Sequence, residues 1–317
     1  MCLGITVVFF IPRLMPTDPV EKVIASLEAQ GGYIDPAALE ETILTLREMY
    51  GLKEGLLNQY ISFWGRLFSL DFGPSLFMFP TPVINLIRTA LPWTAGLLLA
   101  SLVLGWIFGN ILGGLTGYFR RSRILKIFDG IVMFVRPIPY YIMALLLIIF
   151  FAYLLPVFPL GGGYTVGYEI SFTWRFVTDV LKHAFLPLIS LILLNGAMSH
   201  QTMRLLVQSV RDEDYIHYAK IGNVKERTIF GRYVLRNALL PQITGLAMAL
   251  GMIFSGALIT EIVFSYPGIG HLLFRAIMNS DFNLIMGITT ISIVAIATGI
   301  LLIDFLYPLF DPRIRLK

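Results

Sequence analysis

The residues whose spacing most favours an interaction lie in a charged segment, residues 204–240, between two long apolar runs. An acidic cluster that ends at Asp214 would place negative charge at a helix N-terminus, where the helix dipole is positive. Four residues at helical spacing follow, namely Tyr215, Tyr218, Ala219 and Gly222. They give a face that is aromatic at one end and small at the other. Small side chains let another protein approach closely and flanking charges orient it, so this face could bind a partner. A helix that rests on anionic lipid fits the basic residues of the segment equally well.

A turn is predicted directly after this face. Gly222 can adopt the left-handed conformation that ends a helix. Asn223, followed three residues later by Glu226, resembles a capping box for a second helix over Lys225 to Asn237. The segment is therefore predicted to form a helix, a tight turn and a second helix.

Catalytic and metal-binding patterns are absent from the sequence. Cys2 is the only cysteine, and the four histidines (183, 200, 217 and 271) form no ligand-spaced pair, so neither disulfides nor metal sites are expected. No G-x-x-x-x-G-K-[ST] phosphate loop occurs, so ATP binding would require a separate polypeptide, and no bound cofactor is expected. Neither H-E-x-x-H nor G-x-S-x-G is present, which argues against an intramembrane enzyme.

Composition indicates an integral membrane protein. Hydrophobic residues make up 56% of the 317 residues, 14% are charged and the mean hydropathy is +0.77, which leaves too little polar surface for a soluble protein. A helix needs about 20 apolar residues to cross the hydrocarbon core. We expect six transmembrane helices, from one short apolar run and five long ones: residues 1–12, 91–118, 127–154, 184–203, 241–263 and 285–306.

The distribution of Lys and Arg predicts the orientation in the membrane. Loop 119–126 carries four basic residues and no acidic one, segment 204–240 carries seven basic residues, and the tail is also basic, so these parts are placed in the cytoplasm with both termini. Residues 13–90 hold six basic and nine acidic residues and are placed outside, with a small helix expected over Pro36 to Tyr50. This sidedness explains the net charge of +4 and gives no argument for nucleic acid binding.

Four glycines recur every four residues in the second predicted span: Gly105, Gly109, Gly113 and Gly117. They would form a bare strip along one helix face, which is typical of close helix packing. The packing partner could belong to the same subunit or to a second one.

Among the residues of the predicted spans, Arg136 costs the most free energy to place in the membrane, because a charge there is normally paired or faces water. It stands before Pro137 and Pro139 and is a candidate pathway or gate residue. Snorkelling, or an ion pair with Asp129, explains it equally well.

Several ordered motifs resemble one family of membrane proteins. Asp214–Ile216 and Ala219, followed by Leu235–Pro241, resemble the cytoplasmic signature loop of ABC-importer permeases of the oligopeptide/dipeptide/nickel branch. Glu261–Gly270 resembles the turn between the last two spans of that family, and Asp311–Arg315 resembles its C-terminal ending. The resemblance extends almost from end to end of the chain.

The resemblance implies a type I ABC-importer permease fold in the cell inner membrane. Its parts would be a first helix (1–12), an extracytoplasmic helical segment (13–90) and a five-helix core (91–317) with coupling loop 204–240. In such permeases a short loop helix docks on a cytoplasmic ATPase. The residues that match it here are Asp214, Tyr215, Ile216, Tyr218, Ala219, Gly222 and Asn223. Asn223 departs from the glycine usual in the family, and we expect the same bend because asparagine also tolerates it.

The implied partners are a second homologous permease, two ATPase subunits that carry ATP and Mg, an extracytoplasmic substrate-binding protein and membrane lipid. The implied substrates are di- and oligopeptides, with oligosaccharides and nickel complexes as further classes in related permeases. An ion-coupled secondary transporter is the alternative. Such carriers concentrate ionisable residues near the middle of the membrane, where Arg136 stands nearly alone.

Overall fold

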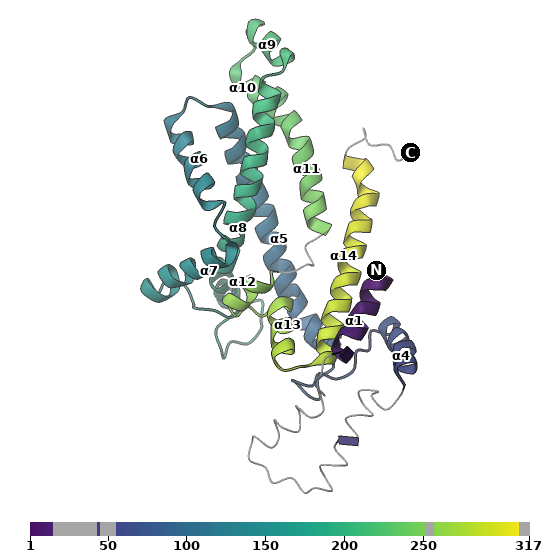
Figure 1. Ribbon diagram of the computed structural model, residues 1–317. Coiled ribbons are helices and arrows are strands. Elements are labelled where there is room, and N and C mark those ends of the chain that lie inside the picture. The colour runs from purple at the N-terminus through teal and green to yellow at the C-terminus, as the bar shows by residue number, and fades with distance from the viewer. Residues whose placement is uncertain (15–42, 45–54, 252–256, 311–317) are drawn as a thin grey trace. The chain divides into compact units, whose positions relative to one another are not determined.

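The computed structural model describes residues 1–14, 43–44, 55–251 and 257–310, and within them it is helical, with no strand (Figure 1). This confirms the all-α class. The helices are, in chain order, α1 (Cys2–Leu14), α4 (Leu56–Phe68), α5 (Val83–Tyr118), α6 (Arg123–Val135), α7 (Tyr140–Ile148), α8 (Trp174–Arg211), α9 (Asp214–Ile221), α10 (Glu226–Thr228), α11 (Arg236–Gly251), α12 (Leu258–Val263), α13 (Ile269–Met278) and α14 (Phe282–Phe310). Two π-helical segments, η1 (Ile149–Leu154) and η2 (Ile229–Leu235), continue α7 and α10.

The chain divides into two compact units. Unit 1 comprises Met1–Trp93 and Pro267–Ala297, and unit 2 comprises Thr94–Tyr266 and Thr298–Lys317. Helices α5 and α14 each contribute to both units. The predicted outer helix Pro36 to Tyr50 lies outside the described residues apart from 43–44.

Aromatic contacts join α1 to α4 in unit 1. Phe9 is fully buried and its ring lies 5.3 Å from that of Phe63 and 5.2 Å from that of Tyr60. Thr6 and Tyr60 share a hydrogen bond of 2.8 Å between their hydroxyls. Helix α4 was not predicted from the sequence, although its apolar residues have the spacing of one buried helix face.

A buried carboxylate joins two segments of unit 1 that are far apart in the chain. Asp281 is fully buried at the start of α14 and accepts hydrogen bonds from the Ser75 hydroxyl, from the Phe77 N–H (3.1 Å) and from the Leu284 N–H (3.0 Å). The last of these caps the N-terminus of α14. Asn283 also donates to the carbonyl oxygen of Pro74. The loop before α5 is thereby fixed to the start of α14.

The glycine strip of α5 packs against α8 within unit 2. A Cβ atom at Gly105 would lie 2.8 Å from the Cβ of Asn195, and one at Gly109 would lie 2.5 Å from the carbonyl oxygen of Gly196. Gly113 and Gly117 meet the backbone of α8 in the same way. Any larger residue would collide with backbone atoms, so the strip permits the close approach of α5 and α8.

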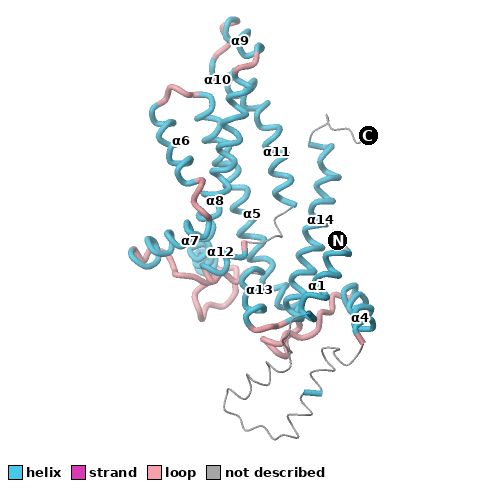
Figure 2. Tube along the Cα trace, viewed as in Figure 1, coloured by secondary structure: helices cyan, strands magenta, loops and turns pink. Residues whose placement is uncertain are grey.

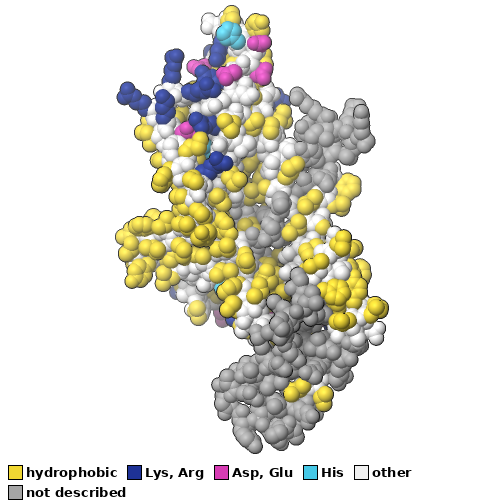
Figure 3. All heavy atoms as spheres, viewed as in Figure 1, with side chains coloured by type: hydrophobic (Ala, Val, Ile, Leu, Met, Phe, Trp, Pro, Cys, Tyr) yellow, Lys and Arg dark blue, Asp and Glu magenta, His cyan; other side chains and the backbone are white. Residues whose placement is uncertain are grey.

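The predicted single span 127–154 is wrong in shape, because it is broken into two helices. Helix α6 and the helix formed by α7 with η1 are bent by 104° with a break of four residues between them (Figures 1 and 2). Pro137 and Pro139 fall in this break, where proline interrupts the helical hydrogen bonds. Apolar side chains dominate the visible surface around α7, the second half of this bent pair (Figure 3).

Within the part of the chain that the structure describes, three helices are long and apolar enough to cross a membrane, namely α5, α8 and the apolar part of α14, and the bent pair gives a fourth if it forms one span. Among the described residues, α1 has 13 residues and α11 has 16, each shorter than a typical span. The predicted span 241–263 contains most of α11 and all of α12, with residues 252–256 outside the described ranges.

Candidate functional site

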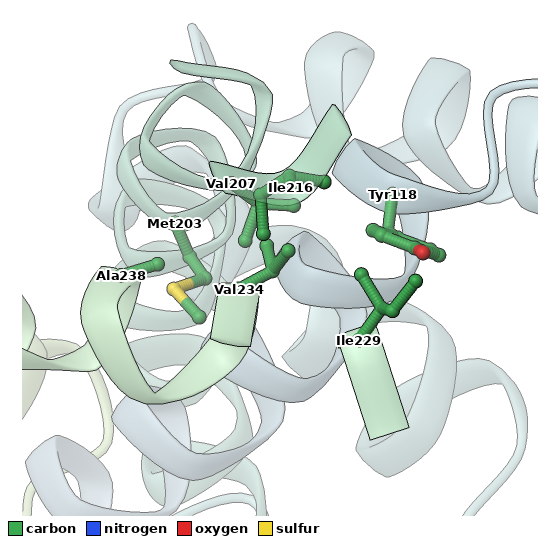
Figure 4. Close-up of a cluster of buried hydrophobic side chains, with 7 residues drawn as sticks. All are labelled: Tyr118, Met203, Val207, Ile216, Ile229, Val234 and Ala238. Carbon is green, nitrogen blue, oxygen red and sulfur yellow. The ribbon is translucent and has the colours of Figure 1, made fainter. Parts of the chain in front are cut away.

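Helix α9 is held to unit 2 by one buried side chain. Ile216 is fully buried in a cluster whose other buried members are Tyr118, Met203, Val207, Ile229, Val234 and Ala238 (Figure 4). These residues come from α5, α8, η2 and α11, so α9 rests on several elements. Its position at the free end of α8 and α11 is visible in Figure 1. Ala219 is partly buried and packs against the same cluster.

The turn after α9 contains one left-handed residue, which is Asn223 (φ 57°). Gly222 has φ −72°, so the predicted left-handed role of Gly222 is wrong. The N–H of Asn223 donates to the carbonyl of Lys220 (3.1 Å) and that of Val224 donates to the carbonyl of Ala219 (3.1 Å). This pair of bonds defines a Schellman turn, in which asparagine is the second-best residue after glycine.

The predicted capping box at the start of the second helix is also wrong. Helix α10 begins after Lys225, which forms no side-chain capping bond, because Asn223 already serves the preceding turn. The predicted second helix over Lys225 to Asn237 does not end at Asn237 either. It continues through η2 into α11, with no break between them. Helix α9 is therefore followed by a single helical arm of mixed α and π geometry.

The outward face of α9 carries apolar side chains. Tyr218 and Ile221 are each 71% exposed, and Tyr215 is 40% exposed with its hydroxyl hydrogen-bonded to the Asn237 amide (3.0 Å). Asp214, Gly222 and Asn223 are also exposed. Ile221 was not among the residues predicted for docking, although it follows Tyr218 by three residues and so shares its helix face. An exposed apolar face on an anchored helix is suited to protein docking.

Arg136 is exposed in the break between α6 and α7, with its N–H bonded to the carbonyl of Val132 (3.0 Å). The ion pair considered between Arg136 and Asp129 is not formed, because Asp129 pairs with Arg204 instead. Asp129 lies 3.1 Å from the guanidinium of Arg204 on α8 and 3.7 Å from Nε2 of His200. This contact fixes α6 to α8.

A second buried carboxylate lies in unit 2. Glu261 on α12 is fully buried and accepts a hydrogen bond from the Thr94 hydroxyl (2.7 Å), so it presents no surface to an external protein. Burial and, to a smaller extent, the nearby Glu261 raise the pKa of Tyr266 to about 12, so this phenol remains neutral at physiological pH. Among the described residues, no three His, Cys, Asp or Glu side chains gather as metal ligands would.

Comparison with known proteins places the sequence of this chain in a family. Residues 109–316 match the family described as binding-protein-dependent transport system inner membrane component. The chain is 31% identical to the oligopeptide transport system permease protein AppB of Bacillus subtilis, over 99% of this chain and 95% of the relative. It is 26% identical to the dipeptide transport system permease protein DppB of Lactococcus lactis, over 99% and 94% of the two chains. It is 28% identical to the oligopeptide transport system permease protein OppB of Salmonella typhimurium, over 98% and 94%.

These matches cover the charged segment, the bent pair and the last helices together. The resemblance to ABC-importer permeases of the peptide branch is confirmed. The chain belongs to the family of binding-protein-dependent transport system inner membrane components.

Proposed function

We propose that this chain is the permease subunit of an ATP-driven importer of di- and oligopeptides. The permease relatives named above carry peptide substrates in their names and match nearly the whole chain. The chain would pair with a second homologous permease and receive peptide from an extracytoplasmic binding protein. Two cytoplasmic ATPase subunits would bind ATP and Mg and supply the energy. This subunit would then contribute the passage and no catalysis.

The observation that carries the proposal is the form of α9. Its outward face exposes Tyr218 and Ile221, while Ile216 on the opposite face is fully buried. A helix with one anchored face and one exposed apolar face can transmit a push from a bound ATPase into α8 and α11, because it has little freedom to move separately. Asp214, Tyr215, Gly222 and Asn223 would border the docked surface, and Ala219 would support it from beneath.

The remaining helices would cross the membrane. Six crossings would be formed by α1, α5, the bent α6–α7 pair, α8, α11 with α12, and α14, in the type I importer arrangement. The excess of Lys and Arg supports a cytoplasmic position for α9 and both termini, with residues 13–90 on the outside. Arg136 would border the passage, since it is an exposed charge at a break between apolar helices.

The test is a double variant, Tyr218→Asp with Ile221→Asp, expressed together with the cognate ATPases. Burying two new carboxylates under a partner is costly, so we expect the ATPases to be lost on purification and ATP-dependent peptide uptake into proteoliposomes to stop. Ile170→Asp with Phe172→Asp is the matched control, because Ile170 and Phe172 are exposed in a loop remote from α9 in the chain. It should retain the ATPases. Parental peptide uptake with bound ATPases in the variant of Tyr218 and Ile221 would refute the docking assignment.

A further inference from the structure

A cavity of about 210 Å³ opens between α5, α6 and α8 at the start of α6. We call it the basic cavity, because the charged side chains that line it are three basic ones, Arg120, Lys126 and Arg204, and one acidic one, Asp129. Figure 3 shows Lys and Arg side chains gathered at this end of unit 2. The N-terminus of α6 adds partial positive charge at the same place.

The charges of the basic cavity do not cancel. Asp129 is neutralised by Arg204, whose guanidinium lies 3.1 Å from its carboxylate. Arg120 is 3.9 Å from Asp212, and both side chains are exposed, so this pair contributes little. Lys126 forms no ion pair among the residues that the structure describes. The cavity therefore presents surplus positive charge to an anion.

A second cavity, of about 140 Å³, lies between the same three helices. We call it the apolar cavity, because it is lined by Ile131, Val132 and Val135 of α6 with apolar residues of α5 and α8 and the ring of His200. Val135 follows Asp129 by six residues, which corresponds to about 9 Å along a helix. His200 borders the apolar cavity and contacts Asp129 of the basic cavity, so the two cavities adjoin.

The outer face of α6 is apolar, as expected of a surface that contacts lipid. Ile124 and Ile127 are 67% and 65% exposed, and Phe134 is 76% exposed. A helix with this face in contact with hydrocarbon places the basic cavity at the polar boundary of the membrane and the apolar cavity deeper within it. A charged site above an apolar one fits an amphiphile with an anionic head.

We propose that the two cavities form a binding site for one anionic phospholipid. Its phosphate would accept hydrogen bonds from Arg120 and Lys126, and one acyl chain would enter the apolar cavity. Basic pockets between membrane helices are suited to anionic headgroups. The site does not depend on the proposed peptide transport. The bound lipid would connect α6 to α5 and α8.

The charged loop supplies a matched test. Arg120 and Lys126 line the basic cavity, whereas Arg121 and Arg123 belong to the same charged segment, residues 119–126, and do not line it. Arg120→Gln with Lys126→Gln and Arg121→Gln with Arg123→Gln remove the same charge. The full-length chain, purified from nanodiscs of phosphatidylglycerol and phosphatidylcholine, is analysed by native mass spectrometry for retained phosphatidylglycerol. We expect the cavity pair to weaken retention about tenfold or more relative to the loop pair, because charge-assisted hydrogen bonds are lost.

The apolar cavity is tested separately by Val132→Phe, which fills it, against Ile127→Phe on the exposed face of α6. Only Val132→Phe should weaken retention, and both variants should unfold at the parental temperature. Equal losses in the two double variants would show diffuse attraction and overturn the site. Displacement of the lipid by inorganic phosphate at millimolar concentration, or no effect of Val132→Phe, would indicate a free-anion site and overturn the lipid assignment.

Discussion

Helices α9 and α13 end in the same turn but are held by different interactions. Each turn has a left-handed residue, Asn223 (φ 57°) after α9 and Ser280 (φ 54°) after α13. In each, the next N–H returns to the carbonyl five residues earlier, from Val224 in one and from Asp281 in the other. Val224 packs against the apolar cluster beneath α9, whereas the Asp281 carboxylate is buried and accepts three hydrogen bonds.

The same type of turn therefore has two structural roles, one held by hydrogen bonds and one held by apolar contacts. Hydrogen bonds to a buried carboxylate are directional and leave large penalties when one partner is lost, so Asp281 makes a fixed joint. Apolar contacts beneath α9 hold its inner side and leave the outer side, with Tyr218 and Ile221, unoccupied by the chain's described residues. Helix α9 is thus attached through its inner side alone, and its outer side stays accessible to a partner protein.

The largest effect is expected for Asp281→Ala. Three donors, from Ser75, Phe77 and Leu284, would lose their acceptor, which should cost about 4 kcal/mol of stability. The melting temperature of the detergent-solubilised protein measures this loss. Asp71→Ala is the control, because the Asp71 carboxylate accepts from the N–H of Gly73 in an exposed position and should cost below about 1 kcal/mol. Equal melting temperatures for the two variants would show that the hydrogen bonds of Asp281 do not fix the turn after α13.

Ile216→Ala should release α9 while the rest of unit 2 stays folded. Truncating a fully buried isoleucine costs about 3 kcal/mol, and here the loss falls on the one side chain of α9 that is fully buried. Amide hydrogen exchange should therefore accelerate at residues 214–224 and remain slow in α8. Ile221→Ala removes an exposed isoleucine from the same helix and should leave exchange at its parental rate. Protection of α9 in both variants would contradict the one-sided attachment.

Asn223→Val tests the turn itself. A β-branched residue is strained at φ 57°, so about 1–2 kcal/mol should be lost and ATPase docking through α9 should weaken. Asn223→Gly is the control and should keep both stability and docking, since glycine adopts this conformation freely. Copurification of the ATPases measures docking. A valine variant that docks like the glycine variant would show that the turn geometry is unimportant.

The smallest effect is expected for Ser280→Gly. Relief of the left-handed strain should stabilise unit 1 by up to about 1 kcal/mol, provided that the fixed joint at Asp281 holds the geometry. The melting temperature should rise by a few degrees at most, whereas Ser280→Ala, which loses the hydroxyl and keeps the strain, should not raise it. A fall in both variants would show that the serine side chain contributes more than its backbone costs.

The local sequence pattern predicted α9 well because its signals are local. The acidic start at Asp214 and the bend at Gly222 and Asn223 need only the neighbouring residues, and α9 begins at Asp214 and ends at Ile221. The capping box failed because Asn223 fits two local roles, and the tertiary contact of Val224 selected the turn.

Other features were missed because their signals are unusual, were not used, or depend on distant contacts. Leu70, Ser265 and Ser280 end helices in the left-handed conformation without being glycine or asparagine, so α4, α12 and α13 lack the usual stop signals. The bend between α6 and α7 was missed although Pro137 and Pro139 mark it in the sequence, because the span was predicted from hydropathy, which measures apolar length and carries no information on direction. The partner of Asp129 is 75 residues away in the chain, at Arg204, and only the fold brings them together.

The glycine strip sets the mechanics of unit 2. From Gly105 to Gly117, about 18 Å of α5 meets α8 with little side chain between them, so the two backbones share one register along the whole contact. Sliding by a fraction of a turn would drive backbone atoms of α8 against Cβ atoms of α5 outside the strip. The two helices therefore behave as one stiff rod, and a force applied at one end reaches the other without being absorbed by shear.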